Sequence, residues 1–209
     1  AIAEEIAEIV DETARVAESE SSAAPDPEKG MSVHWEDQMP KPPQVLLDFT
    51  SDQSMRDWGA EEDNDLLAVE HDTTLKKPVL VKKGHDFEPS VKSRQFNWGF
   101  PHYELTVRLE PESYIYINVL DETGKEHILV YSSVPMPGMN QFQEFVIRLS
   151  KELSDGMWHS LTIDLPEHME RARWPGFVKV NWLSLRGKVS LAGIRGCDDE
   201  DLLMRSAIA

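Results

Sequence analysis

Two neighbouring runs, HYELTVRL at residues 102–109 and YIYINVL at residues 114–120, alternate between apolar and other side chains at nearly every position. Successive side chains of a β-strand point to opposite faces, so this period of two predicts two strands, each with one buried face. The side chains predicted for the core are Tyr103, Leu105, Val107, Leu109, Ile115, Ile117 and Val119. The second run then directs Tyr114, Tyr116 and Asn118 to the opposite face of its sheet.

Further short runs of this kind, separated by turn residues, extend along the chain. They occupy residues 45–49, 66–70, 78–82, 127–131, 145–149, 158–165, 177–185 and 189–194. About ten strands without helices between them predict an all-β, antiparallel sandwich. The segment DETG at 121–124 suits a hairpin turn, because Gly124 accepts positive φ. The one helix expected within this body covers residues 166–173, with Pro166 in its first turn.

Segments of a different character flank the body, which spans residues 45–196. Residues 1–19 have an apolar period near 3.6 and many glutamates, which predicts an amphipathic helix, and residues 20–44 are a Pro- and Ser-rich extended linker. Residues 197–209 start acidic and become apolar, which suggests a second docking arm. The predicted helix at residues 1–19 is so short that it is only marginally stable in water by itself. We therefore expect docking to partner proteins through Ile2, Ile6, Ile9, Val10, Leu202 and Leu203.

Composition narrows the functional classes. The 209 residues include 38 acidic and 21 basic side chains, a formal charge of −17, which disfavours nucleic acid as a partner. No apolar run is long enough to cross a membrane. A single cysteine, Cys197, excludes an intrachain disulfide. The chain starts at Ala1 without an initiator Met, so we expect a mature extracytoplasmic protein, periplasmic or secreted, with import into an organelle as the alternative.

Local motifs of catalysis are missing from the sequence. It holds no G-x-S-x-G elbow, no H-E-x-x-H and no glycine-rich phosphate loop. We expect a non-catalytic protein with no required cofactor. For metals, His71-Asp72 and His85-Asp86 pair imidazole with carboxylate, and Glu61, Glu62, Asp63 and Asp65 form an oxygen-rich loop. A solvated acidic loop is the favoured interpretation of that loop, because the glycine and distal glutamate of an EF-hand are missing.

Several segments together carry a family resemblance. These are VLLDF at 45–49 with Trp58, the strand at 114–119 followed by DETGK, MWHSLTIDL at 157–165, and LSLRG at 183–187 leading into VSLAG. In these four places the chain resembles the galactose-binding-like jelly rolls. That group includes many carbohydrate-binding modules. The run order is also similar to complex I intermediate-associated proteins and spirochaete flagellar sheath proteins. Over residues 45–196 the resemblance implies a jelly roll, and it suggests a structural calcium near Asp48 or near Glu61, Asp63 and Asp65.

One sheet face is unusually aromatic. Flat rings stack on the C–H faces of sugars while neighbouring polar groups bind the hydroxyls. The candidate ligand-binding residues are Arg108, Tyr114, Tyr116, Asn118, Trp182 and Arg186, provided that their strands are neighbours, with Trp98 and Phe100 as alternative platforms. The competing interpretation, which we favour on sequence, makes the tyrosines packing partners and Trp182 a core residue. The sequence therefore predicts a non-catalytic subunit of a multi-protein assembly, with a carbohydrate-binding module as the alternative.

Overall fold

The computed structural model of the chain describes residues 41–51, 56–58, 66–83, 91–134 and 144–199. These residues belong to one compact unit. The predicted N-terminal helix, most of the linker and the C-terminal arm lie outside the described residues. So do the docking residues Ile2, Ile6, Ile9, Val10, Leu202 and Leu203.

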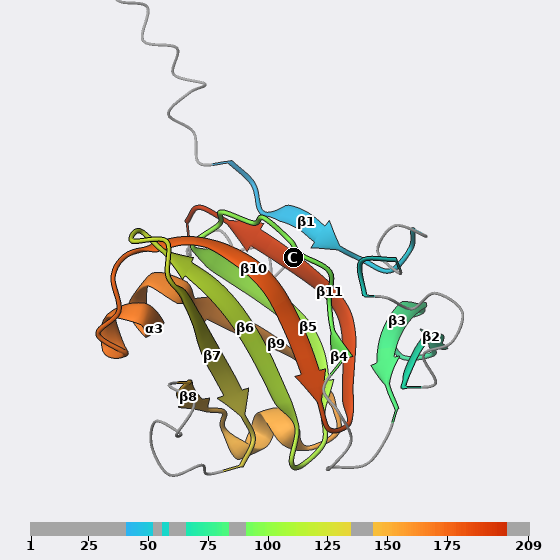
Figure 1. The fold of residues 1–209 in the computed structure, drawn as a ribbon. Helices are drawn as coiled ribbons and strands as arrows, with labels where there is room; N and C mark the ends of the chain where they lie inside the picture. The colour runs from blue at the N-terminus through green and yellow to red at the C-terminus, as the bar shows by residue number, and fades with distance from the viewer. Residues whose placement is uncertain (1–40, 52–55, 59–65, 84–90, 135–143, 200–209) are drawn as a thin grey trace, which may run out of the picture. The chain divides into compact units, whose positions relative to one another are not determined.

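The described chain folds into two β-sheets that face each other across the core (Figure 1). The six-stranded sheet has the order β2-β3-β11-β5-β9, with β1 paired to β11. Its strands are β1 Gln44–Leu47, β2 Leu67–Asp72, β3 Lys77–Lys82, β5 His102–Leu109, β9 Trp158–Asp164 and β11 Val189–Cys197. The five-stranded sheet has the order β4-β10-β6-β7-β8. Its strands are β4 Val91–Lys92, β6 Tyr114–Asp121, β7 Glu126–Ser132, β8 Phe145–Arg148 and β10 Phe177–Arg186.

The predicted β-sandwich is confirmed, and every predicted strand is present within a few residues of its expected bounds. Three features differ from the expectation. The short strand β4 was not predicted, and β8 pairs with β7 in the parallel sense although the other pairings are antiparallel. Cys197, assigned on sequence to the C-terminal arm, is instead the last residue of β11 and is buried.

The core lies between the inner faces of the two sheets. The predicted sets from β5 and β6 are all present in it: Tyr103, Leu105, Val107, Leu109, Ile115, Ile117 and Val119 are each at most 2% exposed. Helix α3, Leu165–Arg171, adds Leu165 and Met169 to this core. Its first turn is capped by Asp164, whose carboxylate accepts a hydrogen bond of 2.9 Å from the Glu167 amide. A 3-10 turn, η2 Lys151–Ser154, precedes β9.

Two buried histidines belong to the structural framework of the described chain. His127 Nε2 lies 2.8 Å from the carboxylate of Asp121, and the hydroxyl of Tyr131 lies 2.9 Å from Nδ1 of His168. Burial lowers the pKa of His168 below its usual value. Burial opposes ionisation of Asp121, but hydrogen bonds from Thr123, His127 and Lys125 outweigh it and hold the pKa of that carboxyl well below its ordinary range.

Candidate functional site

The candidate site is the outer face of the five-stranded sheet, the side that points away from the core. In one row across the strands, Arg186 pairs with Tyr114, Tyr114 with Ser132, and Ser132 with Arg148. In the next row Lys92 pairs with Ser184, Ser184 with Tyr116, and Tyr116 with Val130. A third row holds Trp182, Asn118 and Ile128. Five of the six predicted ligand-binding residues therefore share this face: Tyr114, Tyr116, Asn118, Trp182 and Arg186.

A β-bulge in β10 gives this face an extra side chain. Val180 pairs with Val119 and Trp182 pairs with Asn118, so the register shifts between Val180 and Trp182. Val180 is part of the core, whereas the Asn181 amide reaches Asn118 on the outer side. Asn181 and Trp182, adjacent in sequence, consequently lie on the same face. Strict alternation along residues 177–185 would put Val180 and Trp182 on one face, and it fails here because the bulge breaks the period of two.

Three aromatic rings line the outer face. The rings of Tyr114 and Tyr116 stack with centroids 6.3 Å apart and planes 27° apart. The Lys92 ammonium lies 4.0 Å from the centroid of the Trp182 ring, and the Arg186 guanidinium lies 5.6 Å from that of Tyr114. All three rings are partly exposed and lie outside the core. The expectation that Trp182 is a core residue is therefore wrong.

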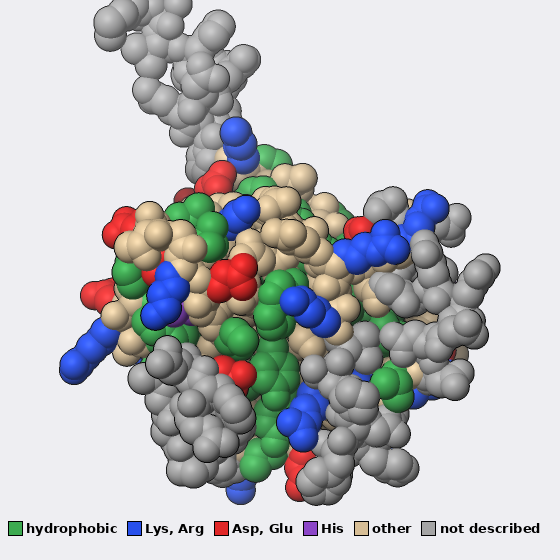
Figure 2. All heavy atoms as spheres, in the orientation of Figure 1, with side chains coloured by type: hydrophobic (Ala, Val, Ile, Leu, Met, Phe, Trp, Pro, Cys, Tyr) green, Lys and Arg blue, Asp and Glu red, His purple; other side chains and the backbone are tan. Residues whose placement is uncertain are grey.

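Figure 2 shows this face from the front, with a column of hydrophobic side chains over β6 and β10 and with Lys, Arg, Asp and Glu side chains beside it. Beside Tyr116 in the second row is Val130, which is buried at 1% exposed and therefore supports the rings without forming part of the accessible surface. The surface thus combines an apolar centre with charged and polar groups around it, which is the composition of a ligand site.

Amide groups fix one end of the face. Nδ2 of Asn181 donates to Oδ1 of Asn118 at 3.0 Å and to Oε1 of Glu126 at 3.2 Å. Asn118 in turn donates to Oε2 of Glu126 at 3.2 Å. Because both carboxylate oxygens of Glu126 are held by amide donors, this network is fixed before any ligand arrives.

Three polar atoms along β10 lack a hydrogen-bond partner within the described residues. They are Oδ1 of Asn181, Oγ of Ser184 and Nε of Arg186, and all three are shielded from solvent. An unsatisfied buried polar group costs about 1–3 kcal/mol, so such groups are rare in native proteins. Elsewhere in the described chain, Trp58 Nε1 and His102 Nδ1 also lack hydrogen-bond partners, but three of these five atoms lie on one strand beside the aromatic rings, where a polar ligand would complete their hydrogen bonding.

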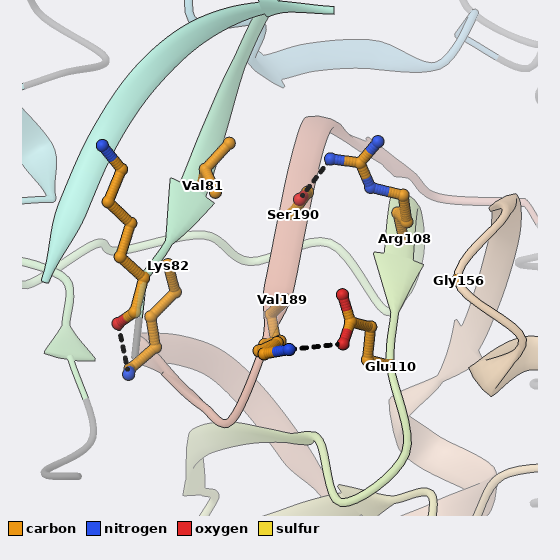
Figure 3. Close-up of a pocket in the computed structure, with 9 residues that line it drawn as sticks. Val81, Lys82, Arg108, Glu110, Gly156, Val189 and Ser190 are labelled. Atoms are coloured by element: carbon orange, nitrogen blue, oxygen red, sulfur yellow. Dashed lines mark hydrogen bonds and ion pairs between the residues drawn. The ribbon is translucent and has the colours of Figure 1, made fainter. Parts of the chain in front are cut away.

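Arg108, the sixth predicted ligand-binding residue, does not join this face. It lies on β5 of the six-stranded sheet, where it donates to Asp72 at 3.2 Å and to Ser190 at 3.1 Å. Its guanidinium also lies 5.0 Å from the centroid of the Trp158 ring. Figure 3 shows Arg108 at the edge of a pocket of about 450 Å³, with Ser190, Glu110 and Lys82 also on the wall. Assigning Arg108 to the aromatic face is wrong because β5 and β6, though consecutive in sequence, belong to opposite sheets.

The alternative platforms serve packing. Trp98 stacks on Phe96 with ring centroids 3.8 Å apart, and both Trp98 and Phe100 pack against the core. A Cβ added at Gly196 would come within 2.6 Å of the Phe100 ring, so backbone and ring are in close contact there. Both side chains are partly exposed, and each has one side of its ring occupied by this packing.

The predicted metal ligands do not form a cluster in the part of the chain that the structure describes. Asp48 accepts a hydrogen bond from the Thr50 amide at 3.0 Å, and contacts with Thr50 lower the pKa of its carboxyl. Glu61, Asp63 and Asp65 lie outside the described residues, as do His85 and Asp86. Among described residues, no three His, Cys, Asp or Glu side chains come together. The carboxylate of Asp72 is occupied by Arg108 and by the indole N–H of Trp158, at 3.2 and 3.1 Å.

Sequence reasoning missed several members of the outer face: Lys92, Glu126, Arg148, Asn181 and Ser184. A signal existed for Ser184, because it alternates with the core residues Leu183 and Leu185 on the same strand. No local pattern marks Lys92, since its strand has two residues. Asn181 joins the face only through the bulge, which alternation cannot reveal.

Comparison with known proteins adds no assignment. No protein-family model matches the chain, and no curated protein is significantly similar to it. None of the helices that the structure describes is both long and apolar enough to cross a membrane.

Proposed function

We propose that this chain is a non-catalytic β-sandwich that binds carbohydrate on the outer face of its five-stranded sheet. One observation carries the proposal. The unpartnered atoms of Asn181, Ser184 and Arg186 lie on the same strand and face as Trp182, next to the strand that bears Tyr114 and Tyr116.

The chemistry of a sugar matches this arrangement. Its C–H faces pack on aromatic rings, and its hydroxyls both donate and accept hydrogen bonds. A ligand on this face must both donate and accept hydrogen bonds. Oδ1 of Asn181 needs a donor, Nε of Arg186 needs an acceptor, and the Ser184 hydroxyl can pair with either. A purely apolar partner, such as a protein core patch, would leave these atoms unsatisfied.

A role as an assembly subunit, which the sequence favours, is our second candidate. It depends on residues such as Ile6 and Leu203, which lie outside the described residues. The extracytoplasmic location is proposed on the sequence alone. Both are compatible with a sugar-binding face, since docking arms and body use different parts of the chain.

The test is retention on immobilised polysaccharides, followed by calorimetry with the glycans that are retained. Trp182→Ala and Tyr116→Ala should each weaken binding about two- to tenfold, since an aromatic contact contributes about 0.5–1.5 kcal/mol. The matched control is Trp158→Ala, which removes a partly exposed tryptophan from the opposite sheet and should leave binding unchanged. Failure of the wild type to bind any glycan, or equal losses for Trp158→Ala and Trp182→Ala, would contradict the proposal.

A further inference from the structure

Two of the three rows on the outer face carry cations, whereas the carboxylate of Glu126 lies at the far end of the same face. The two rows that hold Tyr114 and Tyr116 contain three positively charged side chains, although the chain as a whole is acidic. They are Lys92, Arg186 and Arg148. Those rows contain no carboxylate within the described residues. The carboxylate of Glu126 lies beyond the third row, where two amides already hold it.

These three cations also lack carboxylate partners among the described residues. Lys92 contacts the Trp182 ring, Arg186 contacts the Tyr114 ring, and Arg148 is exposed on the last strand of the sheet. Cations on other surfaces are paired differently: Lys83 lies 3.2 Å from Glu70, and Lys188 lies 3.0 Å from Glu110.

This is unusual for the composition of the chain. With 38 acidic and 21 basic residues, a cation on the surface has many carboxylates to pair with. Three cations without a carboxylate partner among the described residues therefore make these two rows locally positive within a protein of charge −17. At physiological salt this field is felt within about 8 Å, so the acidic groups of distant surfaces are screened from a ligand on the face.

The contact between Lys92 and Trp182 links charge to stacking. The ammonium occupies one face of the indole at 4.0 Å. A sugar that stacks on that face of Trp182 must displace the ammonium, which then needs another partner. A carboxylate or sulfate on the same sugar would supply it, and Arg186, whose Nε lacks an acceptor, offers a second such contact.

We propose that the ligand is an anionic glycan, whose carboxylate or sulfate groups pair with Lys92 and Arg186 while its rings stack on Trp182 and Tyr116. This inference rests on the proposed carbohydrate-binding function and names its substrate class. Arg148 extends the cationic row. It is three strands from Arg186, about 14 Å at the usual spacing of about 4.8 Å, so a chain of several sugars would reach both.

The experiment compares polymers that differ in charge alone. Calorimetry measures the affinity of the full chain for each member of two pairs of polymers. The first pair is polygalacturonate and its methyl ester, and the second is dextran sulfate and dextran. The first pair tests carboxylates and the second tests sulfates. We expect the charged member of at least one pair to bind about tenfold or more tightly than its neutral match. Lys92→Gln and Arg186→Gln should each remove most of that preference, with unchanged thermal unfolding, and Lys83→Gln on the other sheet is the control.

Each result has one meaning. Equal affinity for charged and neutral members overturns the anionic inference and leaves carbohydrate binding intact. Binding to none of the four polymers overturns the anionic inference, and carbohydrate binding is overturned with it only if the panel of immobilised polysaccharides is also negative. A preference that Lys83→Gln reduces as much as Lys92→Gln shows diffuse charge attraction and overturns the assigned site. Tighter binding of a single-stranded DNA oligonucleotide than of any glycan would show that the face binds nucleic acid and would overturn the assignment of an anionic glycan.

Discussion

Replacing Ser184 by alanine should stabilise the fold and weaken ligand binding at once. Ser184 is 3% exposed, and its hydroxyl has no hydrogen-bond partner among the described residues. The substitution removes this hydroxyl and keeps the Cβ, so it leaves almost no cavity. In most buried positions a serine hydroxyl is satisfied, and its removal destabilises the protein.

The magnitude follows from the cost of an unsatisfied group. Burying a hydroxyl without a partner costs about 1–3 kcal/mol. Taking the lower end, because the hydroxyl can rotate toward weak acceptors, Ser184→Ala should raise the free energy of unfolding by about 1 kcal/mol and the melting temperature by roughly 2–4 °C. If a sugar hydroxyl pairs with Ser184, the same variant should lose about three- to tenfold in affinity.

Urea unfolding and calorimetry measure the two effects, and Ser113→Ala is the matched control. Ser113 is fully buried, and its hydroxyl donates to the Lys188 carbonyl at 2.8 Å. Its removal should lower stability by about 1 kcal/mol, the opposite sign. If Ser184→Ala lowers stability as much as Ser113→Ala does, Ser184 has a structural partner and our reasoning about the outer face is refuted.

Three further predictions concern the framework. Ile117→Ala should cost about 2–5 kcal/mol in urea unfolding, because Ile117 is 2% exposed in the core, and a cost below about 0.5 kcal/mol would place it on a surface. Gly187→Ala should destabilise the protein more than Gly124→Ala. Both glycines have positive φ, but only at Gly187 would an added Cβ meet a backbone oxygen at 2.6 Å. Equal losses of stability would show that the turn at Gly187 adapts. Burial lowers the pKa of His168, so its neutral form stabilises the fold and that stability should decline as pH falls below about 6.5. Unfolding measured from pH 8 to pH 5 should show this decline in the wild type and a smaller one in His168→Gln.

Alternation of apolar residues was enough to predict the sandwich. In β5 and β6 it identified every core residue, because a strand with one buried face must repeat every two residues. The prediction failed where a strand does not alternate strictly between its two faces or is too short to show alternation. The bulge in β10 puts Val180 in the core and Asn181 on the outer face, the reverse of what alternation from Leu183 and Leu185 gives, and β4 is too short for any period to be seen.

The site was predicted in outline and missed in its polar detail. Tyr114, Tyr116 and Asn118 were grouped correctly because they share one strand. Arg108 was misplaced, since alternation reports which face a side chain occupies and does not report which sheet its strand joins. Lys92 and Arg186 became neighbours of the rings through strand pairing between distant segments, which no local pattern encodes.

The position of β11 in its sheet bears on how the protein is made. This strand is the last of the described strands in sequence, yet it pairs with β1, β3 and β5 and lies in the interior of the six-stranded sheet. During synthesis, the facing edges of β3 and β5 therefore stay open until residues 189–197 have left the ribosome. Exposed strand edges invite pairing with other chains. We expect nascent chains that stop before Val189 to aggregate, and the six-stranded sheet to close only after residues 189–197 have emerged.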